Sequence, residues 1–262
     1  MKVGFIGLGN MAGAMIKGLT EAGNGTELYG YDVIKEVMEK QEKNNGIKPC
    51  TSASEVVEQA DYVVLAVKPQ FVGNVIEEIK QLDLKEKVII SIVAGKSLAW
   101  YEEAFGVSLK ILRCMPNTAA MVGAAITAVT PSELVTDEEC KNALFIIQSF
   151  GKVEVVPEHL MDAVVGVSGS APAYVFMFIE AMADAAVAGG MPRKQAYEFA
   201  ANAVYGSAKL MMETGLHPGE LKDMVCSPAG TTIDAVRVLE EKNFRGTVMD
   251  AVIAAIEKSK KL

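Results

Sequence analysis

Three small residues near the start of the chain have the spacing of a dinucleotide-binding turn. Gly7, Gly9 and Ala12 follow the apolar stretch 3–6 in the pattern G-x-G-x-x-A. In such a turn the first glycine lets a strand turn sharply, the second lets a pyrophosphate approach bare backbone, and the small third residue lets the next helix pack closely on the strand. The start of that helix is an anion site. A Gly-rich triplet alone also fits a flexible loop, and it is the flanking strand and helix that favour the dinucleotide.

Asp32 is a candidate residue for binding the adenosine end of the dinucleotide. It lies 20 residues after Ala12, at the end of a strand predicted over residues 26–31. A carboxylate there can accept hydrogen bonds from the adenosine ribose hydroxyls and favours NADH, because a 2′-phosphate would meet like charge. Lys35 is close enough in sequence to offset part of that charge. Asp32 equally fits an acidic cap on a helix that begins near Val33, and the two interpretations are compatible.

The segment 227–232, with the sequence SPAGTT, is a second candidate site. It cannot continue the helix predicted before it, and Thr231 or Thr232 is expected to cap a new helix that runs to about Glu241. The turn exposes several backbone N–H groups beside two hydroxyls, which suits a small carboxylate. A plain helix–turn–helix joint explains the same residues equally well. The small polar turn 167–172, which is expected to open a long helix, allows the same two interpretations.

Strands and helices alternate through the first part of the chain, which predicts a parallel, doubly wound sheet that positions the glycine turn. The expected strands are 61–67, 87–93 and 109–114, and the helices between them are 71–80 and 97–104. Two added strands, 123–130 and 152–156, flank a helix over 136–150 that begins with a capping-box pattern. The turns after the strands lie at the carboxyl edge of the sheet, where such sheets bind ligands.

From residue 158 onward the sequence predicts helices only. Residues 173–188 are apolar nearly all round, apart from Glu180 and Asp184, which share one face. These carboxylates could act as acid–base groups, but a narrow solvated or interfacial stripe explains them more simply. A helix with apolar residues on all sides must be buried on several sides, and the other helices predicted after residue 158 are too few to bury it. We therefore expect an obligate homodimer whose interface buries the rest. We expect an α/β protein with a Rossmann-type dinucleotide-binding domain at 1–157 and an all-helical dimerisation and substrate-binding domain at 158–262.

Composition argues against several other classes. A formal net charge of −8 without a long basic block argues against a nucleic-acid partner. No apolar run reaches the length of a membrane span without a charge, Gly or Pro. We expect no signal peptide, because no charged segment or cleavage site precedes the first strand. Four scattered cysteines and two histidines argue against a metal site. They are typical of buried free thiols in a reducing compartment, and we expect a cytoplasmic protein.

With these residues in view, the chain resembles the pyrroline-5-carboxylate reductases. The matching segments are FIGLGNM at 5–11, AVKPQ at 66–70, RCMPNT at 113–118, SGSAPAY at 168–174, HPGELKD at 217–223 and SPAGTTIDAV at 227–236. The resemblance implies hydride transfer from NADPH or NADH to the C=N carbon of 1-pyrroline-5-carboxylate, giving L-proline in the last step of proline biosynthesis. It also implies a homodimer with interleaved C-terminal helices, often assembled further.

The resemblance assigns roles to individual residues. It places the substrate carboxylate on Ser227, Gly230 and Thr231, and the ring nitrogen near the hydroxyl of Thr232. A cyclic imine accepts hydride readily once its nitrogen is protonated or hydrogen-bonded, so Thr232 would orient the imine and assist proton delivery without a metal. The resemblance places the nicotinamide and the rest of the cofactor on Met115, Pro116, Asn117, Gly7, Gly9, Asn10, Met11, Asp32, Ala66, Val67, Lys68, Pro69, Ala94 and Gly95.

Departures from the family pattern concern the adenosine end of the cofactor. Residues 52–54 are Ser-Ala-Ser where many relatives place Asn, and Asp32 stands where relatives carry a basic or hydroxyl residue for NADPH. Other classes of function also fit parts of the sequence. The β-hydroxyacid dehydrogenases use a lysine on the long helix, and residues 166–190 contain none. A reductase of another cyclic imine remains an alternative, as does a non-catalytic dinucleotide-sensing dimer, although a sensor would not need an intact SPAGTT turn.

Overall fold

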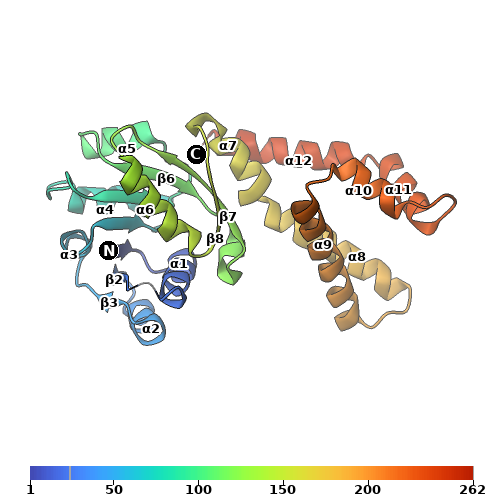
Figure 1. The fold of residues 1–262 in the computed structure, drawn as a ribbon, viewed down its shortest axis with the longest axis horizontal. Helices are drawn as coiled ribbons and strands as arrows, with labels where there is room; N and C mark the ends of the chain where they lie inside the picture. Colours follow the sequence, from blue (N-terminus) through green and yellow to red (C-terminus); the bar gives the residue numbers. More distant parts are fainter. Residues whose placement is uncertain (24, 262) are drawn as a thin grey trace. The chain divides into compact units, whose positions relative to one another are not determined.

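The computed structural model describes residues 1–23 and 25–261, and its first half contains one sheet with helices on both faces (Figure 1). The sheet has eight strands in the order β3-β2-β1-β4-β5-β6-β7-β8. The strands are Lys2–Ile6 (β1), Glu27–Tyr31 (β2), Lys48–Pro49 (β3), Tyr62–Leu65 (β4), Val88–Ser91 (β5), Ile111–Met115 (β6), Ala125–Pro131 (β7) and Gly151–Val155 (β8).

The direction of winding reverses between β1 and β4. From β1 the chain adds β2 and β3 on one side, and β4, β5 and β6 follow on the other side. Ile6 at the end of β1 lies opposite both Tyr31 of β2 and Leu65 of β4, so these three strands end at one edge of the sheet. A reversal of this kind opens a crevice at the carboxyl ends of the strands, where α/β proteins bind ligands. The predicted doubly wound fold is therefore confirmed.

One strand departs from the prediction of a parallel sheet. β7 runs antiparallel to β6, with Leu112 opposite Pro131 and Met115 opposite Ala128. The connection between the two strands, residues 116–124, contains only a short 3-10 turn at Thr118–Val122. A parallel return needs a crossover of about a dozen residues or more, so this connection is too short for one. After a full helix, β8 again runs parallel to its neighbour β7.

Helices pack on both faces of the sheet through predicted apolar positions. Met15 and Ile16 are buried on one face together with Ile147, while Val56 and Ile76 are buried on the other. On the first face lie Asn10–Glu21 (α1), Lys35–Asn45 (α2) and Asp137–Gln148 (α6), and on the second lie Ala53–Gln59 (α3), Val72–Ile79 (α4) and Leu98–Phe105 (α5). The capping box before α6 is present, because Thr136 and Glu139 each accept the other's backbone N–H.

The chain divides into two compact units near residue 169. The first unit comprises residues 1–169 and the end of the chain from Ile256, and the second comprises Ser170–Ala255. The first unit therefore extends past the expected boundary at 157. Its extension contains α7 (Met161–Val164) and is held in the first unit because Met161 is fully buried and the Ser259 hydroxyl donates to Asp162 over 2.6 Å.

The polar segment 167–172 does not form the expected turn. Val165–Gly169 is a π-helical turn, and the helix continues into α8 (Ala171–Ala188) with Pro172 in the first turn, where proline is tolerated. The described residues therefore contain one helical stretch, Glu158–Ala188, that is long and apolar enough by length and composition to cross a membrane. The stretch contains the charges, Gly and Pro noted in the sequence, but Gly, Ser and Pro do not interrupt the helix here. Core helices of soluble proteins meet the same criterion.

The second unit is a set of helices with little core of its own. α8 packs on α9 (Arg193–Thr214) as a hairpin, and the buried apolar residues there are only small ones, Ala183, Ala196 and Ala200. Large side chains are exposed, including Phe176 at 66%, Met177 at 69% and Met224 at 70%. Exposed apolar surface on this scale is typical of an interface. The remaining helices are Pro218–Val225 (α10), Thr231–Glu241 (α11) and Phe244–Ser259 (α12).

Candidate functional site

The turn after β1 has the backbone that the glycine pattern predicts. Gly7 has a φ of 91°, and a Cβ there would lie 2.8 Å from the carbonyl oxygen of Ala66. Its N–H donates to the carbonyl of Tyr31 over 2.8 Å, which ties the turn to β2. A Cβ on Gly9, by contrast, would meet nothing within 4 Å. Gly7 is thus required by the turn itself, and Gly9 presents open backbone to a ligand.

The first turn of α1 is a donor site. Gly9 is its N-cap and brings no side chain to accept the N–H groups that follow. The first N–H groups of a helix have no partner inside the helix, and they favour an anion. Asn10 and Met11 begin the helix beside an exposed cation, Lys68, for which no ion pair is found in the described part of the chain.

One cavity of about 410 Å³ collects most of the residues assigned to the cofactor. It lies at the carboxyl edge of the sheet, and it is bounded by the turns that follow β1, β4, β5 and β6. Predicted residues that line it are Gly9, Asn10, Met11, Ala66, Val67, Lys68, Ala94, Met115, Pro116 and Asn117. Sequence reasoning did not assign Ile92, Thr118 and Gly169, which also line it, although the last two lie within matched motifs. Pro69 and Gly95 do not line this cavity.

Asn117 carries an unsatisfied acceptor in this cavity. Its side-chain oxygen Oδ1 is buried, and it has no hydrogen-bond partner among the described residues. Leaving a buried polar atom unpaired costs about 1–3 kcal/mol, and because Asn117 lines the cavity this atom is a candidate acceptor for a ligand donor. The strand that carries this turn is anchored just upstream, because Arg113 donates to Oε1 of Glu158 over 2.8 Å. The same oxygen accepts from the N–H of Leu98 at the start of α5.

A second cavity, of about 320 Å³, lies beside Gly7. Asp32 lines it and accepts two backbone hydrogen bonds, from Leu8 over 2.7 Å to Oδ2 and from Ile34 over 2.9 Å to Oδ1. The interpretation of Asp32 as a helix cap was wrong, because α2 begins at Lys35 with Ile34 as its cap. Lys35 does not line the cavity, and its Nζ lies 3.6 Å from Glu39.

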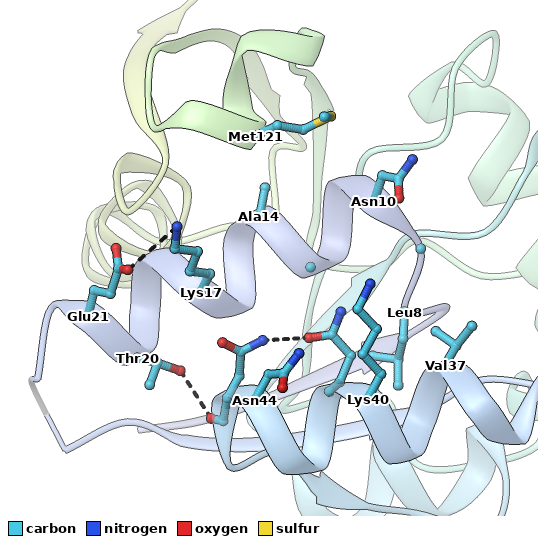
Figure 2. A pocket seen from close by; sticks show the side chains of 14 residues that line it. Leu8, Asn10, Ala14, Lys17, Thr20, Glu21, Val37, Lys40, Asn44 and Met121 are labelled. Atoms are coloured by element: carbon cyan, nitrogen blue, oxygen red, sulfur yellow. Dashed lines mark hydrogen bonds and ion pairs between the residues drawn. The ribbon is translucent and has the colours of Figure 1, made fainter.

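A third cavity, of about 580 Å³, was not foreseen from the sequence (Figure 2). It lies between α1 and α2, where Lys17 and Lys40 project among amide side chains. Lys17 lies 3.7 Å from Glu21, and Asn45 donates to Oε1 of Gln41 over 2.7 Å. Gly9 and Asn10 border both this cavity and the cofactor cavity.

The SPAGTT segment forms a tight turn in the second unit. The N–H of Gly230 donates to the carbonyl of Ser227 over 3.1 Å, and Ala229 has a left-handed φ of 56°. Gly230, not a threonine, is the N-cap of α11, so the predicted Thr231 or Thr232 cap was wrong. Gly230 has extended dihedrals and no side chain, so neither hydroxyl is occupied by capping. The first turn of α11 therefore presents N–H donors, with Thr231 exposed and Thr232 half-buried beside them.

Several other polar groups have structural explanations. Asp184 pairs with Arg193 over 2.6 Å on the exposed face of α8, which agrees with a surface stripe. Burial raises the pKa values of the Cys50 and Cys114 thiols, which keeps them protonated and poorly nucleophilic. Cys140 and Cys226 are half-buried, and within residues 1–23 and 25–261 no three His, Cys, Asp or Glu side chains cluster as metal ligands.

The chain is similar to known proteins over its whole length. A family model described as pyrroline-5-carboxylate reductase dimerisation matches residues 158–262, and one described as NADP oxidoreductase, coenzyme F420-dependent, matches 2–95. Pyrroline-5-carboxylate reductase of Escherichia coli K12 is 52% identical, covering 100% of this chain and 98% of the relative. The Methanosarcina acetivorans enzyme of the same name is 46% identical, covering 100% and 97%.

A solved structure agrees with these relatives. The Plasmodium falciparum pyrroline carboxylate reductase with NADP bound has a TM-score of 0.89 and 34% identity, covering 100% of this chain and 97% of its own. The expected oxidoreductase class and nicotinamide cofactor are thereby confirmed, and the dimerisation model supports a homo-oligomer. The resemblance seen in the sequence motifs is confirmed too, and the chain belongs to the pyrroline-5-carboxylate reductase family.

Proposed function

We propose that this protein reduces 1-pyrroline-5-carboxylate to L-proline with NAD(P)H, the last step of proline biosynthesis. The observation that carries the proposal is the 52% identity to the E. coli pyrroline-5-carboxylate reductase across the full chain. The cavity bounded by four strand-end turns supports the same reaction class, because it joins a helix N-terminus for phosphates to a buried, unpaired amide oxygen.

The first unit has features that fit a nicotinamide dinucleotide. Gly9 leaves open backbone where a pyrophosphate would lie, and the uncapped start of α1 supplies N–H donors. Lys68 adds a positive charge at the same cavity. The Asn117 Oδ1 atom would accept a hydrogen bond from the carboxamide of the nicotinamide and so fix the orientation of its ring. When bound, the reduced nicotinamide supplies the hydride.

The SPAGTT turn would hold the substrate. The backbone N–H groups at Gly230 and Thr231, with the hydroxyl of Ser227, would bind the carboxylate. The hydroxyl of Thr232 would donate to or accept from the imine nitrogen, hold its orientation and assist delivery of its proton. A positioned hydrogen bond suffices because the protonated imine is itself a good hydride acceptor. The contribution of Thr232 would thus be mainly positional.

The proposal also assigns roles to the two domains, an oligomeric state and a location in the cell. Residues 1–157 would bind the dinucleotide, and 158–262 would dimerise and contribute the substrate turn. A second copy would cover the exposed apolar residues of α8 and α9, so the apolar stretch 158–188 would lie in a protein interface and not in a membrane. We further propose an assembly of dimers, no nucleic-acid partner, and a cytoplasmic location.

The proposal is tested by following oxidation of NADH and NADPH at the absorbance of reduced nicotinamide, with and without pyrroline-5-carboxylate. We expect oxidation only with the imine, formation of L-proline, and a fall in kcat of about 100-fold in Thr232→Ala, which is typical of misplacing a reacting group by about 1 Å. Thr247→Ala, on α12, is the matched control. If both nucleotides bind and neither is consumed, the reductase proposal fails in favour of another imine or a dinucleotide-sensing dimer.

A further inference from the structure

The cavity beside Asp32 has two charged side chains, and both are acidic. Asp32 lies at the end of β2, and Glu78 projects from α4 into the same cavity. No Lys, Arg or His of the described chain lines it. Gly7 and Val67 also line it, so it adjoins the glycine turn on the side where the adenosine of a dinucleotide would lie.

The carboxylate of Asp32 is held in one orientation. Its two oxygens accept from the N–H groups of Leu8 and Ile34, at 2.7 and 2.9 Å. Each oxygen retains acceptor capacity, because an ionised carboxylate has about four lone-pair sites. Two ribose hydroxyls can donate to those sites, whereas an ionised phosphate has no proton to donate. The fixed carboxylate therefore suits a ribose with a free 2′-hydroxyl.

Glu78 adds a second negative charge that sequence reasoning did not find. Its Oε1 accepts from the N–H of Ser54 at the start of α3 over 3.2 Å, which holds the carboxylate at the cavity. The cation that the sequence offered as compensation, Lys35, is turned toward Glu39. A phosphate carries a charge of about −1.5 to −2 near neutral pH. It would thus meet two carboxylates without a compensating cation.

We infer that the Asp32 and Glu78 carboxylates make this protein select NADH over NADPH, with Glu78 as a second specificity-determining residue. The inference rests on the proposed use of a nicotinamide dinucleotide. Because like charges repel across this partly exposed cavity, we expect each carboxylate to weaken binding of a 2′-phosphate by roughly tenfold. Two such neighbours give a preference of about 100-fold.

Fragments of the cofactor that lack the nicotinamide test the selectivity at the adenosine end by binding alone, without catalysis. ADP-ribose and 2′-phospho-ADP-ribose are titrated calorimetrically into the full-length protein, wild type and Glu78→Gln. The glutamine keeps an oxygen for the Ser54 N–H and removes only the charge. Glu77→Gln is the matched control, because Glu77 is the neighbouring residue on α4, pairs with Lys80 over 2.6 Å and does not line the cavity.

We expect wild type to bind ADP-ribose about 100-fold more tightly than 2′-phospho-ADP-ribose, and Glu78→Gln to reduce that ratio to about tenfold. Glu77→Gln should keep the wild-type ratio. Equal or tighter binding of the phosphorylated fragment by wild type overturns the inference. An unchanged ratio in Glu78→Gln would show that Glu78 does not contribute to the choice between the two cofactors. Failure of the reductase proposal is recognised separately, as no imine reduction with either nucleotide whatever the fragment ratio.

Discussion

Leu8 and Asp32 are joined by a 2.7 Å hydrogen bond from the backbone N–H of the glycine turn to a carboxylate oxygen at the end of β2. The Asp32 side chain thus has two roles. It holds the glycine turn, which would approach the pyrophosphate, and it lines the cavity where the adenosine would lie. A substitution at this position therefore affects both the turn and the ribose contact. Measuring stability and cofactor binding separately distinguishes the effect on the turn from the effect on the ribose contact.

The first prediction concerns this shared role. Asp32→Ala should weaken binding of NADH, because the Leu8 N–H and the ribose hydroxyls lose their acceptor and the glycine turn loses its anchor. Binding of NADPH should weaken less, because the same substitution removes one of the two charges that repel the 2′-phosphate. We expect the free energy of unfolding to fall by about 1.5–3 kcal/mol, the usual cost of losing a hydrogen bond to a charged group. Urea unfolding and calorimetric titration measure the two effects. Tighter binding of NADPH with unchanged stability would show that Asp32 acts only through its charge.

Asn117 provides the second prediction. Because the unpaired Oδ1 atom costs about 1–3 kcal/mol, Asn117→Ala should leave the nucleotide-free protein at least as stable as the wild type. The same substitution should weaken NADH binding by about tenfold, the equivalent of one lost hydrogen bond of about 1.4 kcal/mol. Thermal unfolding with and without NADH gives both quantities. Loss of stability without NADH, together with unchanged binding, would contradict a ligand-directed role.

Thr127 offers the contrasting case. Its hydroxyl is also buried without a hydrogen-bond partner among the described residues, but it lies inside β7 and lines none of the three cavities described above. Thr127→Val replaces the hydroxyl by a methyl group of similar shape and keeps a β-branched side chain for the strand. Stability should rise by about 1 kcal/mol, with NADH affinity unchanged. A destabilised variant would show that the hydroxyl has a partner, such as a bound water.

The glycine turn and its surroundings were predictable from sequence because local chemistry determines them. Gly7 is needed for a positive φ, and the residues after β1, β4 and β6 meet because parallel strands end at one edge. Glu78 was not predictable in the same way. It is one of two neighbouring glutamates on α4, and only the packing of that helix against the sheet places it, and not Glu77, at the cavity with Asp32.

The C-terminal helices show a different limit on what the sequence predicts. Residues 167–172 contain Gly, Ser and Pro, which locally favour a turn, yet the chain accommodates them in a π-helical turn and the first turn of α8. The threonines after the SPAGTT turn are typical N-caps, yet Gly230 takes that position. In both places the local preference is real, and the tertiary structure selects a less common alternative. These are also the segments that carry the family's motifs.

Glu139 leads to a prediction on pH. Burial alone would raise the pKa of its carboxyl, but hydrogen bonds from Lys110 and from Thr136 outweigh burial and hold that pKa below its usual value. A lowered folded-state pKa stabilises the fold above the ordinary pKa of a glutamate, about 4.3, and that stabilisation is lost as the pH falls through the folded value. Glu139→Gln should therefore show a shallower loss of stability below about pH 4.3. Urea unfolding from pH 7 to pH 3 measures it, and parallel curves would contradict it.

Ala229 supplies the last prediction, because it has a left-handed φ of 56° inside the SPAGTT turn. An L-residue with a Cβ is strained there by about 1–2 kcal/mol, whereas glycine is not. Ala229→Gly should therefore stabilise the protein by about 0.5–1 kcal/mol, although glycine is normally the less stabilising residue. Ala235→Gly, in the interior of α11, is the control and should destabilise by about 1 kcal/mol.

The same pair of variants tests why the strain is present. Strained backbone persists where the surrounding structure holds it, and it often accompanies a binding site. If the turn holds the substrate carboxylate, Ala229→Gly makes the turn more stable but also less restricted before the substrate binds. The KM for pyrroline-5-carboxylate should then rise a few-fold, while the Kd for NADH stays constant. A rise in stability with no change in KM would show that the strain at Ala229 belongs to the turn alone.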